Sequence, residues 1–157
     1  MKISQFHITF SLTCILIFLV GCQGDEGVRF LERKSFDGDL PSEYVNDQTN
    51  VQMETEKSIY SKSINEIKIT VSNQGPNPIA FGTYYRVEKY QENAWYEVPL
   101  NIQFTDIGLS IKTNETYNDE VQIEHLDYQL TQGLYRIVKE FRTENDDFRI
   151  AAKFTID

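Results

Sequence analysis

Few side chains in this sequence could carry out acid–base, nucleophilic or metal chemistry. The chain has two histidines and two cysteines among 157 residues. His125 and Asp127 stand two residues apart, so in an extended segment they share a face and could pair as a base and its orienting carboxylate. No Gly-x-Ser-x-Gly nucleophile motif accompanies them. His7 lies in an expected N-terminal export signal that is removed, and the one histidine that remains is too few for a zinc site. We therefore predict no catalytic residue, no metal site and no cofactor, and interpret His125 as an exposed loop residue.

Carboxylates are numerous but are not arranged as paired catalytic groups. Glu54 and Glu56 fall on the outer side of an expected strand, whereas a glycosidase needs two carboxyl groups that face each other across a cleft. The segment "TENDD" at 143–147 offers oxygen ligands for Ca²⁺ but lacks the spaced Asp-x-Asp-x-Asp-Gly loop. We interpret it as a solvated hairpin turn. The chain is therefore predicted not to be an enzyme.

The one reactive group with a clear context is the thiol of Cys22. An apolar run from Ile8 to Val20 precedes it, and the run follows a short start that carries Lys2. This run matches the apolar region of a signal peptide and is shorter than the ~18 residues of a membrane span. The junction Leu19-Val20-Gly21-Cys22 resembles the lipobox of bacterial lipoproteins. The resemblance implies a signal peptide at 1–21, transfer of a diacylglyceryl group to Cys22, and an extracytoplasmic protein anchored to the membrane by lipid. The alternative is an ordinary signal peptide with a chance cysteine.

The charge of the chain limits its partners. Removal of residues 1–21 leaves 14 basic and 24 acidic residues, a formal charge of about −10. Such a surface repels phosphate backbones, so nucleic acid is excluded as a partner. Since Cys14 leaves with the signal and Cys22 carries lipid, no disulfide is expected, and the domain must be held together by its core.

The elements that would position a site begin after a segment with no sustained period. Residues 22–48 have mixed charge, three glycines and one proline, and we predict a lipidated cysteine followed by a flexible tether. A short helix through "VRFLERK" is the alternative, although seven residues are too few for a helix to persist alone.

From 49 to 157 the sequence alternates between apolar and polar residues in short segments separated by turns. Hairpins are expected around Gln91–Asn93 and around "RTENDD". Seven to eight strands without an amphipathic helix predict an all-β, antiparallel two-sheet sandwich with Greek-key connections. The residues expected to point inward are Val51, Met53, Ile67, Ile69, Val71, Ile79, Phe81, Tyr85, Val87, Tyr117, Val121, Ile123, Phe148, Ile150, Ala152, Phe154 and Ile156.

A tyrosine corner makes the sandwich prediction more specific. Leu130, Gly133 and Tyr135 have the spacing with which a tyrosine that enters a strand bonds back to the backbone a few residues upstream. Such corners occur in the penultimate strand of immunoglobulin-like (Ig-like) sandwiches. The disulfide of that fold is absent, so Trp95 and the other aromatic residues are expected to fill its place in the core.

The chain from about residue 50 onward also resembles a bacterial Ig-like domain family of Gram-positive lipoproteins and surface proteins. The segments that carry the resemblance are "METEKSIYS", "FGTYYRVEKY", "WYEVP" and "LTQGLYRIVK". The resemblance implies an Ig-like sandwich, commonly behind an export signal. It implies no catalytic activity.

One hairpin has the side-chain types of a binding surface. If Phe81, Tyr85 and Val87 point inward, the period of two sends Tyr84, Arg86, Glu88 and Tyr90 outward. Trp95 is expected in the core by its size, which leaves Tyr96 outside. We therefore predict a binding patch of Tyr84, Arg86, Tyr90 and Tyr96. The alternatives are that tyrosines simply suit strands, or that a bulge at Gly82 reverses the pattern.

These observations leave two functions open. The first is a non-catalytic Ig-like interaction module at the cell envelope, whose partner is another envelope protein or the wall polymer. The second is a carbohydrate-binding or small-ligand-binding domain, which would need an exposed aromatic platform.

Overall fold

The computed structural model describes residues 30–157, which form strands, turns and one short 3₁₀ helix. The predicted signal peptide, Cys22 and the start of the predicted tether lie outside the described residues. The elements are β1 (Glu43–Val45), β2 (Asn50–Thr55), β3 (Ile59–Tyr60), β4 (Glu66–Asn73), β5 (Ile79–Gly82), β6 (Arg86–Gln91), β7 (Ala94–Glu97), β8 (Gly108–Ile111), β9 (Glu115–Gln122), η1 (Ile123–His125), β10 (Gly133–Arg142) and β11 (Asp147–Ile156).

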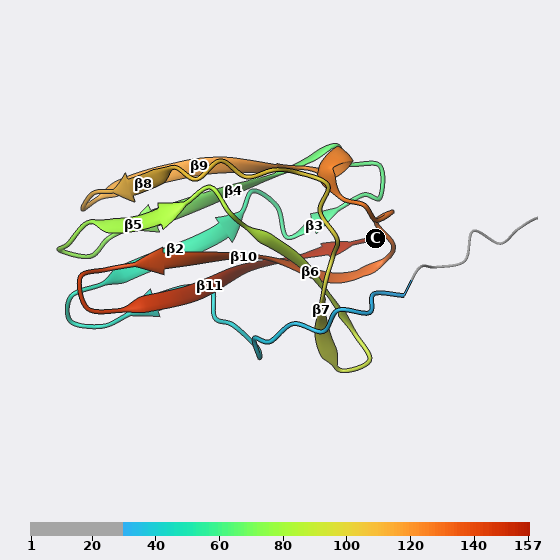
Figure 1. Cartoon of the computed structure of the whole chain (residues 1–157), viewed down its shortest axis with the longest axis horizontal. Helices are drawn as coiled ribbons and strands as arrows, with labels where there is room; N and C mark the ends of the chain where they lie inside the picture. The colour runs from blue at the N-terminus through green and yellow to red at the C-terminus, as the bar shows by residue number, and fades with distance from the viewer. Residues whose placement is uncertain (1–29) are drawn as a thin grey trace, which may run out of the picture.

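These strands form two sheets that face each other (Figure 1). The smaller sheet has the order β1-β2-β4-β9, and the larger has the order β3-β11-β10-β5-β8. Strand β10 pairs with β5 at one end and with β6 at the other, and β7 extends the sheet from β6. All pairs are antiparallel except β3 with β11. The predicted all-β, immunoglobulin-like sandwich is therefore confirmed.

The core lies between the two sheets and is built from alternate residues of the long strands. On β4 the buried apolar residues are Ile67, Ile69 and Val71, and the ten-residue strand β11 buries five alternate positions from Phe148 to Ile156. A period of two with one apolar face matches the pleat of a strand, so these positions could be identified in advance. Of the residues predicted to point inward, only Tyr117 and Ile123 are partly exposed, and both still pack against the core.

The tyrosine corner is present at the start of β10. The Tyr135 hydroxyl donates to the Thr131 carbonyl oxygen at 2.8 Å and accepts from the Thr131 backbone N–H at 3.1 Å. Gly133 lies between them with φ of 149°, a value that side-chain-bearing residues rarely adopt. The ring of Tyr135 is fully buried and stacks on Phe154. The corner thus fixes the loop before β10 to the core.

Residues 31–42, which we call the strap, do not behave as a tether. Leu31 is buried, and Ser35 and Arg33 form backbone hydrogen bonds of 2.9 and 2.8 Å with Trp95 and Glu97 of β7. Further along, the strap crosses to β11, as the blue segment shows in Figure 1. The residues that follow it form β1, which pairs with β2. The flexible segment predicted for 22–48 is therefore wrong for residues 31–45. The strap binds mainly polar and charged groups rather than an apolar core. Its composition is therefore similar to that of a flexible linker.

No helix within residues 30–157 is long and apolar enough to cross a membrane.

Candidate binding surface

The strap covers the outer face of the larger sheet, the face turned away from the smaller sheet. At the centre of this face is Glu88 of β6, whose side chain is fully buried. The Arg136 guanidinium donates to Glu88 Oε2 from Nε at 2.7 Å and lies 2.6 Å away through Nη2. Glu88 Oε1 accepts from Arg86 Nε at 3.1 Å and from the Ser35 hydroxyl at 2.8 Å. One carboxylate therefore joins β6, β10 and the strap.

A second carboxylate, Asp37, is part of the strap and binds the strap to the sheet. It pairs with the Arg86 Nη2 atom and, at 3.0 Å, with Arg149 Nε of β11. The Phe36 ring lies over both guanidinium groups, with its centroid 4.5 Å from Arg86 Cζ and 5.0 Å from Arg149 Cζ. Arg136 Nη1 also donates to the Gly38 carbonyl oxygen at 2.7 Å. The strap is thus bound by ion pairs, cation–π contacts and backbone hydrogen bonds.

The buried charges on this face are paired with one another. Burial disfavours the charged form of Arg86, but the carboxylates of Glu88 and Asp37 outweigh burial and raise the pKa of the guanidinium. Among the described residues, no buried side-chain nitrogen or oxygen lacks a hydrogen-bond partner. The face under the strap is therefore a closed polar layer rather than a ligand-binding surface.

The predicted patch of Tyr84, Arg86, Tyr90 and Tyr96 is not a continuous surface. Tyr84 and Tyr90 are exposed by 53% and 41%, respectively, whereas Arg86 is buried under the strap. In the β6–β7 register, Tyr90 faces Trp95 and Lys89 faces Tyr96. Tyr96 is therefore on the inner side and packs against the core. Placing Tyr96 in an outer patch was wrong.

The expectation for Trp95 was wrong for the same reason. Trp95 lies on the outer face, outside the core between the sheets, with the Arg136 guanidinium 4.2 Å from its ring centroid. Aromatic rings of Phe81, Phe141, Phe148, Phe154 and Tyr135 fill the core instead. Sequence reasoning also missed Asp37 and Arg136, because nothing in a period of two marks an outward charge as buried.

Two exposed apolar side chains, Phe36 and Ile107, lie near Arg86, as Tyr84 does. Phe36 is 65% exposed and Ile107 is 49% exposed. Tyr84, Arg86 and Ile107 line one shallow hollow of about 370 Å³, and Phe36 stacks on Arg86. We call Phe36, Tyr84 and Ile107 the apolar patch. Large apolar and arginine side chains together are typical of binding hot spots.

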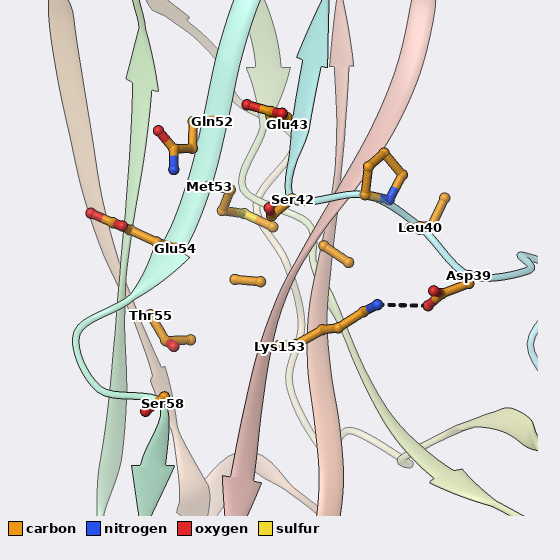
Figure 2. Close-up of a pocket in the computed structure, with 13 residues that line it drawn as sticks. Asp39, Leu40, Ser42, Glu43, Gln52, Met53, Glu54, Thr55, Ser58 and Lys153 are labelled. Atoms are coloured by element: carbon orange, nitrogen blue, oxygen red, sulfur yellow. Dashed lines mark ion pairs between the residues drawn. The ribbon is translucent and has the colours of Figure 1, made fainter.

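A wider groove opens between the edges of the two sheets (Figure 2). Its volume is about 710 Å³, its floor includes Met53 and Ala152, and its rim carries Glu43 and Glu54. Lys153 and Asp39 point toward each other in Figure 2 and pair at 2.7 Å. The hydrogen bond from Lys153 lowers the pKa of the Asp39 carboxyl. The groove is open, and its rim is mainly acidic.

The inner face of the larger sheet also carries two buried lysines, Lys89 and Lys139. Lys139 of β10 is fully buried and pairs with Asp119 of β9 at 3.2 Å, which joins the two sheets. Burial lowers the pKa of Lys139, and Asp119 opposes that shift. Its ammonium group lies 5.6 and 5.9 Å from the ring centroids of Phe81 and Tyr85, respectively. These contacts give Lys139 a structural role in the sandwich.

The candidate base and its neighbour lie away from these features. His125 ends η1, its side chain is 34% exposed, and its Nε2 atom is 4.0 Å from a Glu124 oxygen. The Asp127 backbone N–H donates to the Pro99 carbonyl oxygen at 2.9 Å. Within residues 30–157, no group of three or more His, Cys, Asp or Glu residues is placed to hold a metal ion. His125 is thus half-buried in a short helical turn, not in an exposed loop.

The sheet topology and the tyrosine corner together define an Ig-like β-sandwich. The sequence model of the family described as "Bacterial Ig-like domain" matches residues 47–155. The chain belongs to this family. No curated protein matches the chain.

Several solved structures resemble the chain at low identity. A β-glucosidase from Erythrobacter marinus is 12% identical with a TM-score of 0.39, over 69% of this chain and 16% of its own. The putative ApaA protein from Bordetella pertussis is 14% identical with a TM-score of 0.40, over 74% and 95% of the two chains. The alkylpurine DNA glycosylase AlkC from Pseudomonas fluorescens, bound to DNA, is 11% identical with a TM-score of 0.34, over 68% and 30%.

Proposed function

We propose that this chain is a lipoprotein of the cell envelope, held outside the cytoplasm by lipid on Cys22, whose Ig-like domain binds another envelope protein or the wall polymer without catalysis. The observation that carries the anchor is the sequence Leu19-Val20-Gly21-Cys22 directly after an apolar run. Because the strap begins at Leu31, only the residues between Cys22 and Leu31 separate the domain from the lipid. Fully extended, they span at most about 30 Å.

The anchor is tested by replacing each cysteine of the chain in turn. In Cys22→Ser cells the protein should appear in the medium or as an uncleaved precursor, because no other thiol of the mature chain can accept lipid. Cys14→Ser is the matched control: Cys14 lies in the segment that is removed, so the protein should stay in the membrane fraction. A wild-type protein that is freely soluble and begins at another residue would contradict the lipoprotein assignment.

The apolar patch supports the interaction module. It places two exposed aromatic rings and an isoleucine beside two ion-paired arginines that contact Phe36, the buried Arg86 and the partly exposed Arg149. A rigid patch of this kind loses little conformational freedom on binding. Crosslinking in intact cells should give a discrete adduct that Tyr84→Ser abolishes while the unfolding midpoint stays unchanged. Lys112→Ser is a control on an exposed side chain outside the patch. An adduct that Tyr84→Ser leaves at full strength would contradict this surface.

A further inference from the structure

A second hollow on the outer face lies on the other side of the strap from the apolar patch. It has a volume of about 460 Å³ and lies between the strap and the β6–β7 hairpin. The residues that matter for its chemistry are Trp95, Tyr90, Asn93, Gly38, Asp39 and Lys153. We call it the tryptophan pocket.

The pocket has a rigid aromatic wall. The Tyr90 and Trp95 rings meet edge to face, with centroids 5.2 Å apart and planes at 62°. Arg136 is fully buried and holds the indole through its guanidinium, 4.2 Å from the ring centroid. Trp95 is itself mostly covered, so the accessible part of the wall is the 41% exposed ring of Tyr90. The wall is thus preorganised for an apolar face of a ligand.

The rim of the pocket is polar and balanced in charge. Asp39 and Lys153 pair at 2.7 Å and keep part of their surfaces exposed, so both can still bond to a ligand. Asn93 has φ of 62°, and its exposed side-chain amide can both donate and accept. Lys34 and the buried Asp37 add one charge of each sign. The lining therefore carries as many positive as negative side chains, on a protein that is strongly acidic overall.

We propose that the tryptophan pocket binds a neutral saccharide, with a sugar ring against the exposed ring of Tyr90, which Trp95 supports, and its hydroxyl groups on Asp39, Lys153 and Asn93. A sugar ring offers an apolar C–H face and a periphery of hydroxyls that both donate and accept. That combination matches an aromatic wall with a mixed, charge-balanced rim. This inference rests on the proposed envelope location, where wall glycans are within reach, and it names the ligand class of the carbohydrate-binding alternative.

Trp95 is the only tryptophan of the chain, so its fluorescence reports on this pocket directly. The detergent-solubilised mature protein is titrated with chitotetraose, cellotetraose and maltotetraose as neutral probes, and with an oligogalacturonate as an anionic probe. At least one neutral probe should change the fluorescence in a saturable way, at least tenfold more tightly than the anionic probe. No saturable change with any neutral probe up to about 10 mM, or preference for the anionic probe, would overturn the proposal.

Two glycines offer a matched pair of variants. A side chain at Gly38 would meet nothing within 4 Å, and its backbone lies outside the region that favours glycine, so Gly38→Phe should fill the pocket without strain. Gly108 is equally open but lines the hollow by the apolar patch, so Gly108→Phe is the control. Gly38→Phe should weaken saccharide binding at least tenfold, and Gly108→Phe should leave it unchanged.

A second pair covers the case in which Gly38→Phe does not fold. Tyr90→Ser should weaken binding at least tenfold, and Tyr84→Ser should not. Unchanged binding in Tyr90→Ser would overturn the proposed wall. The titration uses purified protein and the anchor is tested by cell fractionation, so failure of the pocket and failure of the lipoprotein assignment are distinguishable.

Discussion

From Tyr135 to Lys139, strand β10 is buried on both faces, but by different means. On the inner face, Tyr135, Ile137 and Phe141 pack against apolar residues of both sheets. On the outer face, Arg136 is equally inaccessible, yet it is surrounded by a carboxylate, an indole ring and a carbonyl group of the strap. Apolar packing tolerates gradual change, because each lost contact costs a little. A charged layer does not, because a single missing partner leaves a buried charge uncompensated.

The largest expected effect is on the outer face, at Glu88. Glu88→Gln keeps the side-chain volume but removes the carboxylate shared by Arg86 and Arg136. We expect the free energy of unfolding to fall by about 3–5 kcal/mol, measured by urea denaturation. Glu140→Gln is the control, because Glu140 is half exposed and pairs with Arg149 at 3.5 Å. Its loss should be at most about 1 kcal/mol. Similar small losses for both variants would show that the outer layer is not a coupled network.

The strap should respond to a change at Asp37. Asp37→Asn removes the ion pairs to Arg86 and Arg149 but leaves Glu88 with Arg136. We expect a loss of about 1.5–3 kcal/mol. Hydrogen exchange should accelerate most at the Ser35 and Glu97 amides, which join the strap to β7.

The matched control for Asp37 is Asp39→Asn, whose side chain is 73% exposed. It should leave exchange at those two amides unchanged. Equal exchange across β7 and β10 in Asp37→Asn would mean that the strap does not open separately from the sandwich.

On the inner face, the tyrosine corner gives a smaller effect. Tyr135→Phe keeps the stacked ring but removes the hydroxyl that bonds to both backbone groups of Thr131. The free energy of unfolding should fall by about 0.5–1.5 kcal/mol without a change of fold. The exposed Tyr84 provides the control, since Tyr84→Phe should change stability by less than about 0.5 kcal/mol. An unchanged urea midpoint in Tyr135→Phe would show that the corner bonds contribute nothing.

The smallest effect at neutral pH is expected at Tyr85. Burial, assisted by the charge of Asp119, raises the pKa of the Tyr85 hydroxyl to about 12. Between pH 10 and 12 the unfolded chain ionises this group while the folded protein does not, so stability is lost as pH rises. Tyr85→Phe should remove up to about 1.4 kcal/mol per pH unit from that slope. The pKa values of Tyr117 and Tyr135 are also raised, so the variant should still lose some stability as the pH rises. An identical slope in the variant, measured by urea unfolding from pH 9 to 12, would contradict this account.

The strands with one face in solvent could be predicted from the sequence. In those strands, apolar residues alternate with polar ones, and the alternation shows which face is buried. Strand β4 is the clearest case, with Lys68 exposed between Ile67 and Ile69. The corner at Tyr135 could also be predicted, because it depends on local spacing. The covered side of β6 could not be. Arg86 and Glu88 have the residue types of an exposed face, and the strap that buries them is remote in sequence.

The error at Trp95 and Tyr96 has a local cause. A three-residue turn at Gln91–Asn93 would place Tyr96 on the side of Tyr90. The structure has a two-residue turn in which Glu92 and Asn93 take φ of 49° and 62°, and Gln91 pairs with Ala94. Such a turn puts Trp95 opposite Tyr90. Because the turn is one residue shorter, Trp95 rather than Tyr96 borders the tryptophan pocket.

The course of the strap has a mechanical consequence. Force applied to the chain ahead of Leu31 would reach the two hydrogen bonds to β7 first, then the contacts of Asp37, and only then the pairing of β1 with β2. These attachments lie one after another along the chain, so they would break in turn, as in peeling, rather than share the load. Release of residues 31–45 would add a segment with an extended length of about 50 Å to the chain ahead of the folded core. Under tension, the strap would therefore act as a reserve of chain length.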